Sequence, residues 1–216
     1  HEIGPAAGQH VDSGSSKGGR VSLLIEPTSH WKVRLTATGQ ETRRNGTDYV
    51  DYDVGTSRPV EGGASRKLAL AEPYSVRLGV AAADIEYDFG WARLNSISSA
   101  QATRLIQRTD YSYVYGPLVG ADFVAADARA DVHKQTQEFR LTSKAGTRFE
   151  WLAGYYFDHE AGQNHQADTA FAAGDLLHAN LPSTYRENAL YGDLTWNATP
   201  AFALTGGLRI ARNSQT

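Results

Sequence analysis

The chain has 216 residues, of which 41% are hydrophobic and 21% are charged, and its formal net charge is −3. No window approaches the roughly 18 uncharged apolar residues of a membrane helix, so helical membrane proteins are excluded. A membrane β-barrel remains compatible, because its apolar residues alternate with polar ones. The near-neutral charge argues against nucleic acid as a partner, and the absence of cysteine removes disulfide, thiolate and zinc-cluster chemistry.

The first structural signal is a hairpin near the start of the chain. Residues 1–19 have no periodicity and are typical of a loop. Apolar residues then alternate with polar ones over 21–25, and a second alternating run covers 31–37. A period of two indicates strands, and the short segment 27–30 between the runs predicts a tight turn.

The same pattern, two alternating runs joined by a short turn, occurs three more times along the chain. Long polar stretches of roughly 25 to 35 residues separate the hairpins, far beyond the usual connection of about 4–6 residues. The predicted hairpins pair residues 83–87 with 92–94, 139–141 with 149–157, and 190–196 with 202–210.

Short turns on one side and long loops on the other are typical of outer-membrane barrels. The pattern predicts an all-β fold, an antiparallel transmembrane β-barrel segment of about eight strands with short periplasmic turns and long extracellular loops. The face opposite the apolar one is charged, as a water-filled interior allows. An aromatic belt at the periplasmic interface would explain why four residues lie close to the short turns: Trp31, Trp91, Trp151 and Trp196.

The alternation also constrains the strand register. Apolar residues must share one face on both strands of a hairpin, so the parity of the loop length is restricted. Residues 76–80 alternate out of phase with 83–87, which predicts a bulge or a boundary between them. Two pairs of unlike charge are predicted to lie directly opposite each other: Arg140 and Glu150 around a loop at 144–146, and Glu86 and Arg93 around a loop at 89–90.

Several segments together resemble the barrel of TonB-dependent outer-membrane receptors, over residues from about 11 to 212. They are GGRVSLLIEPT at 18–28 with VRLTA at 33–37, QEFRLTS at 137–143 with WLAGYYF at 151–157, and ALYGDLTW at 189–196 with LTGGLR at 204–209. The resemblance implies a barrel of about 22 strands closed by an N-terminal plug. It also implies import of a scarce nutrient with energy relayed by the TonB complex.

This resemblance sets the expected function. We expect residues 1–216 to form part of the barrel domain, a fragment without the plug, the energy-coupling segment and the terminal strands. Ferric siderophores are the commonest cargo of such receptors, and cobalamin and glycans are others. The expected location is the outer membrane of a Gram-negative bacterium, in contact with its lipid. No nucleophile elbow, paired carboxylates or phosphate loop is present, so we expect neither an enzyme nor a cofactor.

Two groups of residues are candidates for ligand binding. Tyr111, Tyr113 and Tyr115 alternate in a long polar stretch, where their rings could grip a siderophore or a sugar. An interfacial aromatic belt or a strand extension explains them as well. Arg43 and Arg44 lie at the top of the second strand and could attract an anionic chelate, although a solvated rim explains them equally.

Two acidic or histidine-containing groups have the residue types of a metal site, but we expect no metal at either. Their spacings fit no metal-binding template, and polar loop composition explains both. One group is Asp158, His159, Glu160, His165 and Asp168, and the other is Asp48, Asp51 and Asp53.

Two other classes of protein stay open. A passive outer-membrane channel, or a complete small eight-stranded barrel, would share the alternation but lack energy coupling. A soluble β-propeller of the kelch type would share the period near 50 residues. A propeller blade needs four strands and a dry face, whereas each period here has two strands and a charged face.

Overall fold

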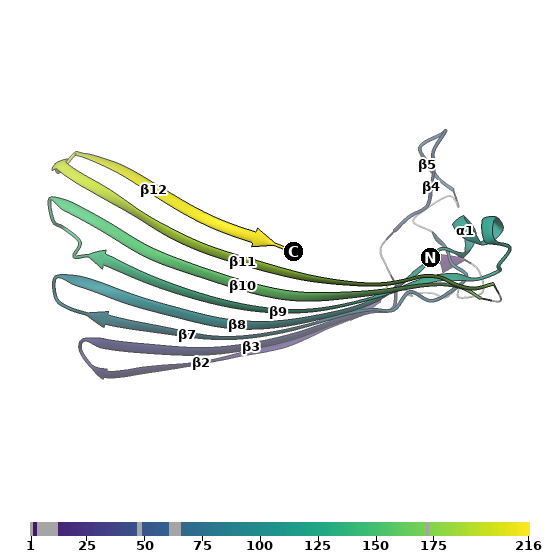
Figure 1. Cartoon of the computed structure of the whole chain (residues 1–216), viewed down its shortest axis with the longest axis horizontal. Coiled ribbons are helices and arrows are strands. Elements are labelled where there is room, and N and C mark those ends of the chain that lie inside the picture. Colours follow the sequence, from purple (N-terminus) through teal and green to yellow (C-terminus); the bar gives the residue numbers. More distant parts are fainter. Residues whose placement is uncertain (1, 4–12, 47–48, 61–65, 172) are drawn as a thin grey trace.

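The structure is a computed structural model that describes residues 2–3, 13–46, 49–60, 66–171 and 173–216. A single curved layer of eight antiparallel strands dominates it (Figure 1), so the predicted all-β class and strand number are confirmed. Neighbouring strands in the sheet follow chain order. They are β2 (Gly14–Thr28), β3 (Trp31–Arg44), β7 (Tyr74–Asp88), β8 (Ala92–Asp110), β9 (Val124–Ser143), β10 (Phe149–Ala170), β11 (Gly174–Thr199) and β12 (Phe202–Gln215).

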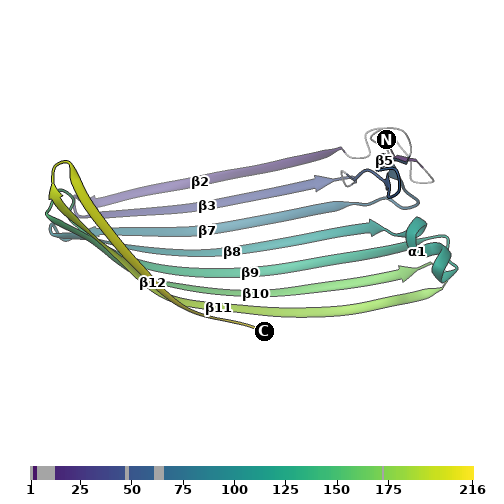
Figure 2. The ribbon, with the colours of Figure 1, turned by 90° about the horizontal axis from the view of Figure 1, so that it is seen from above.

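The minor elements lie at the end of the sheet opposite the hairpin turns (Figure 2). There β1 (Glu2–Ile3) pairs in parallel with β6 (Arg66–Lys67), and β4 (Tyr52–Asp53) pairs with β5 (Arg58–Pro59). The only helix in the described residues is α1 (Ser112–Val119). No helix among them is long and apolar enough to cross a membrane.

The sheet does not close on itself. Its two edge strands are β2 and β12, and among the described residues they pair with β3 and β11 only. The alternative of a complete eight-stranded barrel therefore does not describe this structure. The chain forms a curved wall whose two edges are open.

The connections differ from the predicted ones on the loop side. One long connection, 45–73, joins β3 to β7, whereas 111–123 includes α1 and 171–173 is short. The polar stretches predicted as loops are mostly strand, because β8 to β11 continue far beyond their apolar parts. A strand with water on both faces needs no apolar alternation, so the pattern did not mark these extensions.

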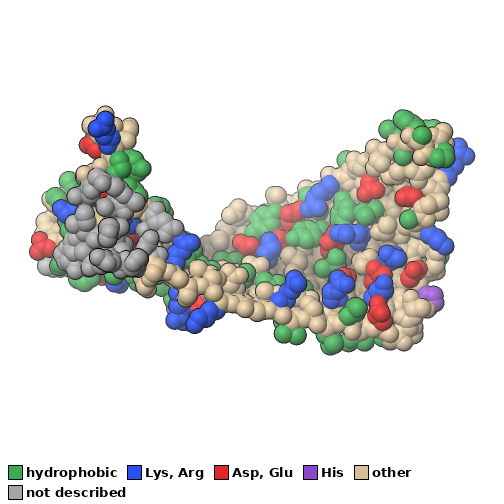
Figure 3. Space-filling model, turned by 180° about the vertical axis from the view of Figure 1, so that it is seen from behind, with side chains coloured by type: hydrophobic (Ala, Val, Ile, Leu, Met, Phe, Trp, Pro, Cys, Tyr) green, Lys and Arg blue, Asp and Glu red, His purple; other side chains and the backbone are tan. Residues whose placement is uncertain are grey.

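The two faces of the sheet differ in chemistry. The outer face carries the apolar side chains of the hairpins, and these are widely exposed, with Val21 at 74%, Leu190 at 65% and Leu208 at 70%. Residues directly opposite each other in an antiparallel pair share a face, so the register assigns the charged residues between them to the inner face. Figure 3 shows side chains of both charges gathered over the hollowed inner face.

The predicted parity of the register is correct, but both predicted opposed pairs are wrong. Arg140 lies opposite Gly154 around a longer turn at 144–148, and Arg93 lies opposite Asp88 around 89–91. The Arg93 guanidinium still contacts Glu86 diagonally, at 3.2 Å between Nε and Oε1. A shift by an even number of residues keeps every side chain on its face, so alternation cannot distinguish these registers.

The predicted bulge in β7 is also absent. Residues 74–88 pair without interruption with both neighbouring strands. Val76, Leu78 and Val80 therefore lie on the inner face, in line with Glu86. The apolar side chains therefore change from the inner to the outer face along β7 without any irregularity in the strand.

The aromatic residues near the turns form a continuous row of ring contacts. Trp31 lies 4.7 Å from Tyr87, Tyr87 lies 4.7 Å from Phe89, and Phe89 lies 6.1 Å from Trp91, measured between ring centroids. Trp91 then contacts Trp151 of β10 at 6.4 Å. The prediction that the tryptophans gather at the turn end is confirmed for these neighbouring strands.

Gly154 provides a test of the inner-face packing. A Cβ at this position would overlap the ring of Tyr191, which lies directly opposite on β11. We expect Gly154→Ala to displace that ring and to destabilise the sheet by about 1–3 kcal/mol, as overpacking does. Urea unfolding in lipid vesicles would measure the loss. A matched Gly79→Ala change, whose Cβ meets nothing within 4 Å, should be nearly neutral; equal losses would contradict the packing argument.

Candidate functional site

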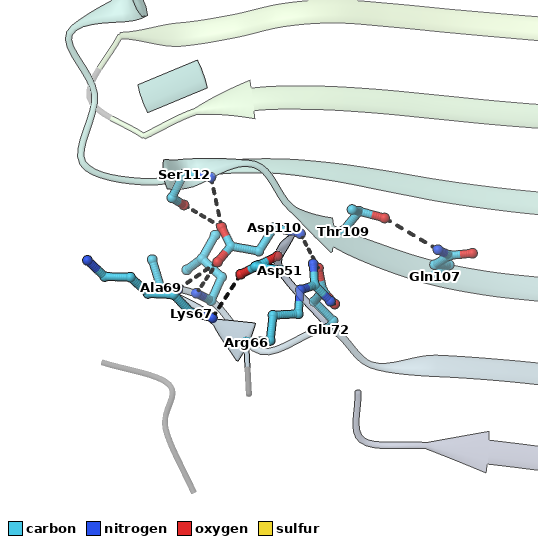
Figure 4. A network of polar contacts seen from close by, with 10 residues as sticks. Asp51, Arg66, Lys67, Ala69, Glu72, Gln107, Thr109, Asp110 and Ser112 are labelled. Atoms are coloured by element: carbon cyan, nitrogen blue, oxygen red, sulfur yellow. Dashed lines mark hydrogen bonds and ion pairs between the residues drawn. The ribbon is translucent and has the colours of Figure 1, made fainter. Parts of the chain in front are cut away.

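The loop end of the sheet is organised around the buried carboxylate of Asp110, the last residue of β8. Its Oδ2 accepts hydrogen bonds from the backbone N–H groups of Ala69 at 2.6 Å and Leu70 at 3.0 Å. Its Oδ1 accepts from the backbone N–H of Ser112 at 2.9 Å and from the Ser112 hydroxyl. One side chain therefore joins the long connection 45–73 to the start of α1 (Figure 4).

A buried ion pair lies beside this carboxylate. Arg66 of β6 donates from both terminal nitrogens to Glu72, with one hydrogen bond at 2.8 Å, and the Glu72 side chain is fully buried. Glu72 Oε1 also accepts the backbone N–H of Asp110 at 2.7 Å. A bidentate pair that is almost fully buried fixes both groups in one geometry. We call Arg66, Glu72, Asp110 and Ser112 the loop junction.

The three candidate tyrosines lie next to the loop junction. Tyr111 precedes α1, and Tyr113 and Tyr115 belong to it, so a strand extension does not explain these residues. Positions four residues apart share one face of a helix, and the rings of Tyr111 and Tyr115 lie 5.3 Å apart. The Tyr113 ring lies 4.5 Å from the Lys67 ammonium. All three rings are partly exposed, at 37% to 47%; ligand binding by them stays a prediction.

The two candidate arginines lie at the end of β3 as predicted, but on opposite faces. Arg43 is on the outer face with Glu41, and its guanidinium contacts that carboxylate at 2.8 Å. Arg44 is on the inner face, in register with Tyr74 of β7. The structure therefore separates the two arginines and leaves only Arg44 on the side of the inner wall.

A polar network follows the inner wall below the loop junction. Lys134 of β9 contacts the buried carboxylate of Asp158 at 2.7 Å, and the Tyr156 hydroxyl donates to it at 3.3 Å. Asp158 Oδ1 is buried and accepts no hydrogen bond within the described residues. A buried carboxylate oxygen of this kind is able to accept a further donor.

Tyrosines and arginines continue this inner-wall network across β9 to β12. Arg140 donates to Glu138 at 2.8 Å, and the Tyr191 hydroxyl also donates to Glu138. On the neighbouring strands, Arg209 contacts Glu187 and lies 5.6 Å from the centroid of the Tyr156 ring. The inner face of the sheet therefore presents hydrogen-bond donors, acceptors and aromatic rings on its concave side.

The structure divides the first candidate metal group between the two faces of β10. In β10, Asp158, Glu160 and Asp168 alternate with His159 and His165, so the two residue types lie on opposite faces of the sheet. No cluster of three or more His, Asp or Glu residues that could hold a metal ion occurs among the described residues.

The acidic residues before β6 have structural roles. Asp51 Oδ2 accepts the backbone N–H of Lys67 at 3.1 Å. Asp53 accepts the backbone N–H and the hydroxyl of Thr56, both at 2.7 Å, and these hydrogen bonds lower the pKa of its carboxyl. Asp48 lies outside the described residues.

Sequence reasoning missed the loop junction. Its carboxylates stand in polar stretches without periodicity, and the residues that they contact are distant in the chain. One local signal was present: the Asp-x-Ser pattern at 110–112, typical of a carboxylate that accepts the N–H two residues later. The contacts with Ala69 and Leu70 have no counterpart in the local sequence.

The comparisons with known proteins bear on the fold. No protein-family model matches the sequence, and no curated protein matches it. Among solved structures, the chain is similar to FyuA, the ferric yersiniabactin uptake receptor from Yersinia pestis, with a TM-score of 0.79 and 18% identity over 99% of this chain. It is also similar to BauA, the ferric preacinetobactin receptor from Acinetobacter baumannii, with a TM-score of 0.71 and 14% identity over 94% of this chain.

The chain covers 32% of the FyuA chain and 34% of the BauA chain, so it spans about a third of each receptor. At these identities the likeness establishes the fold and not the ligand. It confirms the resemblance inferred from the hairpin segments: the curved wall has the fold of part of a TonB-dependent receptor barrel.

Proposed function

We propose that the chain is part of the wall of an outer-membrane receptor that takes up a scarce nutrient, with a ferric siderophore as the ligand class. One observation carries the proposal: the outer face is apolar and exposed while the inner face is charged, in a sheet with the fold of receptor barrels. An apolar outer band needs lipid around it, and a charged inner face needs water or a polar filling. The proposed location is therefore the outer membrane of a Gram-negative bacterium.

In this receptor the loop junction would hold the ligand-facing loops in place. The edge-to-face pair Tyr111–Tyr115 lies at the loop end of the sheet and offers an aromatic face and hydroxyl groups to a chelate. Arg44 would add positive charge on the inner side, whereas Arg43 faces outward and is removed from the proposed ligand site. Energy would come from the TonB complex, through parts of the receptor outside this chain. We propose no catalytic role.

The experiment is competition binding to the whole receptor in outer-membrane vesicles, with ferric siderophores, cobalamin and oligosaccharides as competitors. A ferric siderophore should bind and compete in a saturable way. A passive channel would instead conduct small solutes without saturation and without dependence on the proton-motive force. A receptor with no affinity for any of the three classes would refute the proposed function.

Site variants sharpen the same measurement. Tyr111→Ala and Tyr115→Ala should each weaken siderophore binding about two- to tenfold, the range expected for one aromatic contact. The control is Tyr52→Ala, which removes a more exposed ring, at 59%, from β4 of the same loop end. If Tyr52→Ala weakens binding as much as the α1 variants do, the tyrosine pair is not the ligand contact.

A further inference from the structure

We propose that the outer face carries a binding site for one membrane lipid with a phosphate headgroup. The phosphate would bind to arginines on β7 and β8, and an acyl chain would lie in the groove below them. The inference rests on the proposed position of the chain in an outer membrane, and it concerns the outer side of the wall, away from the proposed siderophore site.

The first observation is an opposition of like charges. Arg77 of β7 lies directly across from Arg104 of β8 on the outer face. Like charges in directly opposed positions destabilise a sheet, so this arrangement needs compensation. Part of it comes from carboxylates on the far side of each arginine: Glu41 lies 2.6 Å from Arg77 Nε, and Asp131 lies 2.5 Å from Arg104 Nε.

The compensation is incomplete because each carboxylate is shared with a second arginine. Arg43 contacts Glu41 at 2.8 Å, and Arg129 contacts Asp131 at 2.7 Å. Four guanidinium groups therefore face two carboxylates, and the four arginine side chains are 49% to 60% exposed. We call these four arginines, Arg43, Arg77, Arg104 and Arg129, the arginine row.

The arginine row has the chemistry of a phosphate site. A guanidinium group has five donors in a planar fork, and the contacts to Glu41 and Asp131 use only some of them. Phosphate oxygens match this fork and are bound by paired hydrogen bonds. A phosphate between Arg77 and Arg104 would relieve their repulsion.

The second observation is a groove of about 720 Å³ on the same strands, nearer the turns. This volume falls within the range of about 300–1,000 Å³ that small-molecule sites occupy. Small side chains form its floor, and larger apolar ones stand at its two sides. The principal lining residues are Leu35, Ala37, Ala81, Ala83, Ala100 and Phe157.

A smooth strip connects the groove to the arginine row. Gly39, Gly79 and Ala102 lie opposite one another in register, between the two features. A Cβ at either glycine would meet nothing within 4 Å, so packing within the chain does not require glycine there. Ala81 and Arg77 are four residues apart, about 13 Å along a strand.

Charge complementarity indicates which kind of molecule would bind to the groove and the arginine row. A basic row at one end and a largely apolar groove at the other match an amphiphile with an anionic head, whereas an uncharged apolar partner would leave the arginines unmatched. The arginines lie at the upper border of the apolar outer face, where lipid headgroups would meet the wall of a membrane barrel. A phosphate-bearing lipid fits both ends at once.

The test uses the whole protein, purified and placed in phosphatidylcholine vesicles that contain phosphatidate with the same acyl chains. Native mass spectrometry of the released protein should find retained phosphatidate in preference to phosphatidylcholine. Inorganic phosphate should compete poorly, because it lacks the acyl chain. Equal retention of both lipids, or full displacement by inorganic phosphate, would overturn the lipid site.

Three variants locate the site. The double change Arg77→Gln and Arg104→Gln should weaken phosphatidate retention about tenfold or more, since charged hydrogen bonds are lost. It leaves Arg43 and Arg129 to neutralise the two carboxylates, so the fold should be kept. Ala81→Trp should fill the groove and weaken retention similarly. The matched control, Arg186→Gln, removes an exposed outer-face arginine of β11 and should have no effect.

The outcomes separate this inference from the proposed function. A protein that binds a ferric siderophore but retains phosphatidate equally in wild type and in the double variant overturns the lipid site alone. A protein that selects phosphatidate but binds no siderophore overturns the proposed function alone. If Ala81→Trp changes the number of protein copies and not the lipid retained, the groove is an interface between copies, and the inference is wrong.

Discussion

Asp110→Ala is expected to release the long connection 45–73 from the rest of the loop end. The change removes the acceptor of three backbone N–H groups, those of Ala69, Leu70 and Ser112. A buried N–H without an acceptor costs about 1–3 kcal/mol, so the docked loop should lose roughly 3 kcal/mol or more. The first observable is faster hydrogen exchange at these three amides, and the second is protease cleavage within 45–73.

The control for this prediction lies in the other connection at this end of the sheet, 111–123. Asp122 is an exposed aspartate between α1 and β9, and Asp122→Ala should change neither exchange nor cleavage. Siderophore affinity should fall with Asp110→Ala only if the docked loops form the ligand site. Unchanged exchange at Ala69 and Leu70 would show that the loop junction does not hold the connection in place.

A second large effect is expected where the outer face meets lipid. Leu35 and Thr36 are neighbours on β3 that point to opposite faces, and Leu35 lies in the middle of the apolar band. Leu35→Arg should destabilise the inserted protein by about 2–4 kcal/mol, the cost of a cation at the centre of a bilayer. Thr36→Arg, on the wet inner face, should cost much less.

Reversible urea unfolding in lipid vesicles would compare these two variants with the wild type. The comparison tests the assignment of faces directly, because the substituted residue and the depth in the wall are matched. A larger loss for Thr36→Arg would mean that the inner face is the buried one, as in a soluble propeller. Equal losses would mean that neither face lies against lipid.

Most of the correct predictions rest on the alternation of apolar and polar residues. The four hairpins, the antiparallel order and the two faces all follow from a period of two, which the apolar residues near the turns display strongly. The predicted loops were wrong where the period was weak. The strands β10 and β11 continue through polar sequence because backbone hydrogen bonds, and not side-chain burial, hold them there.

The candidate site was predicted only in part. The tyrosines near 111–115 and the arginines at 43–44 do lie at the loop end, but the sequence did not predict the helix that brings the Tyr111 and Tyr115 rings together edge to face. The opposite faces of Arg43 and Arg44 follow from β-strand geometry and were available from the sequence. The partners of Asp110 were not, since they lie about forty residues away in the chain.

By itself the sequence determined which side chains share a face, because alternation is a local property of each strand. Only the tertiary structure decided which residues meet across the strands. The hydrogen-bonded ladders and the turns chose one register among those that alternation allows, so Arg140 meets Gly154 and not Glu150. The register between β7 and β8 likewise places Arg77 opposite Arg104 and so brings the arginines of the arginine row together. The face on which a side chain lies follows from its position in the strand, whereas the residue opposite it follows from the register between strands.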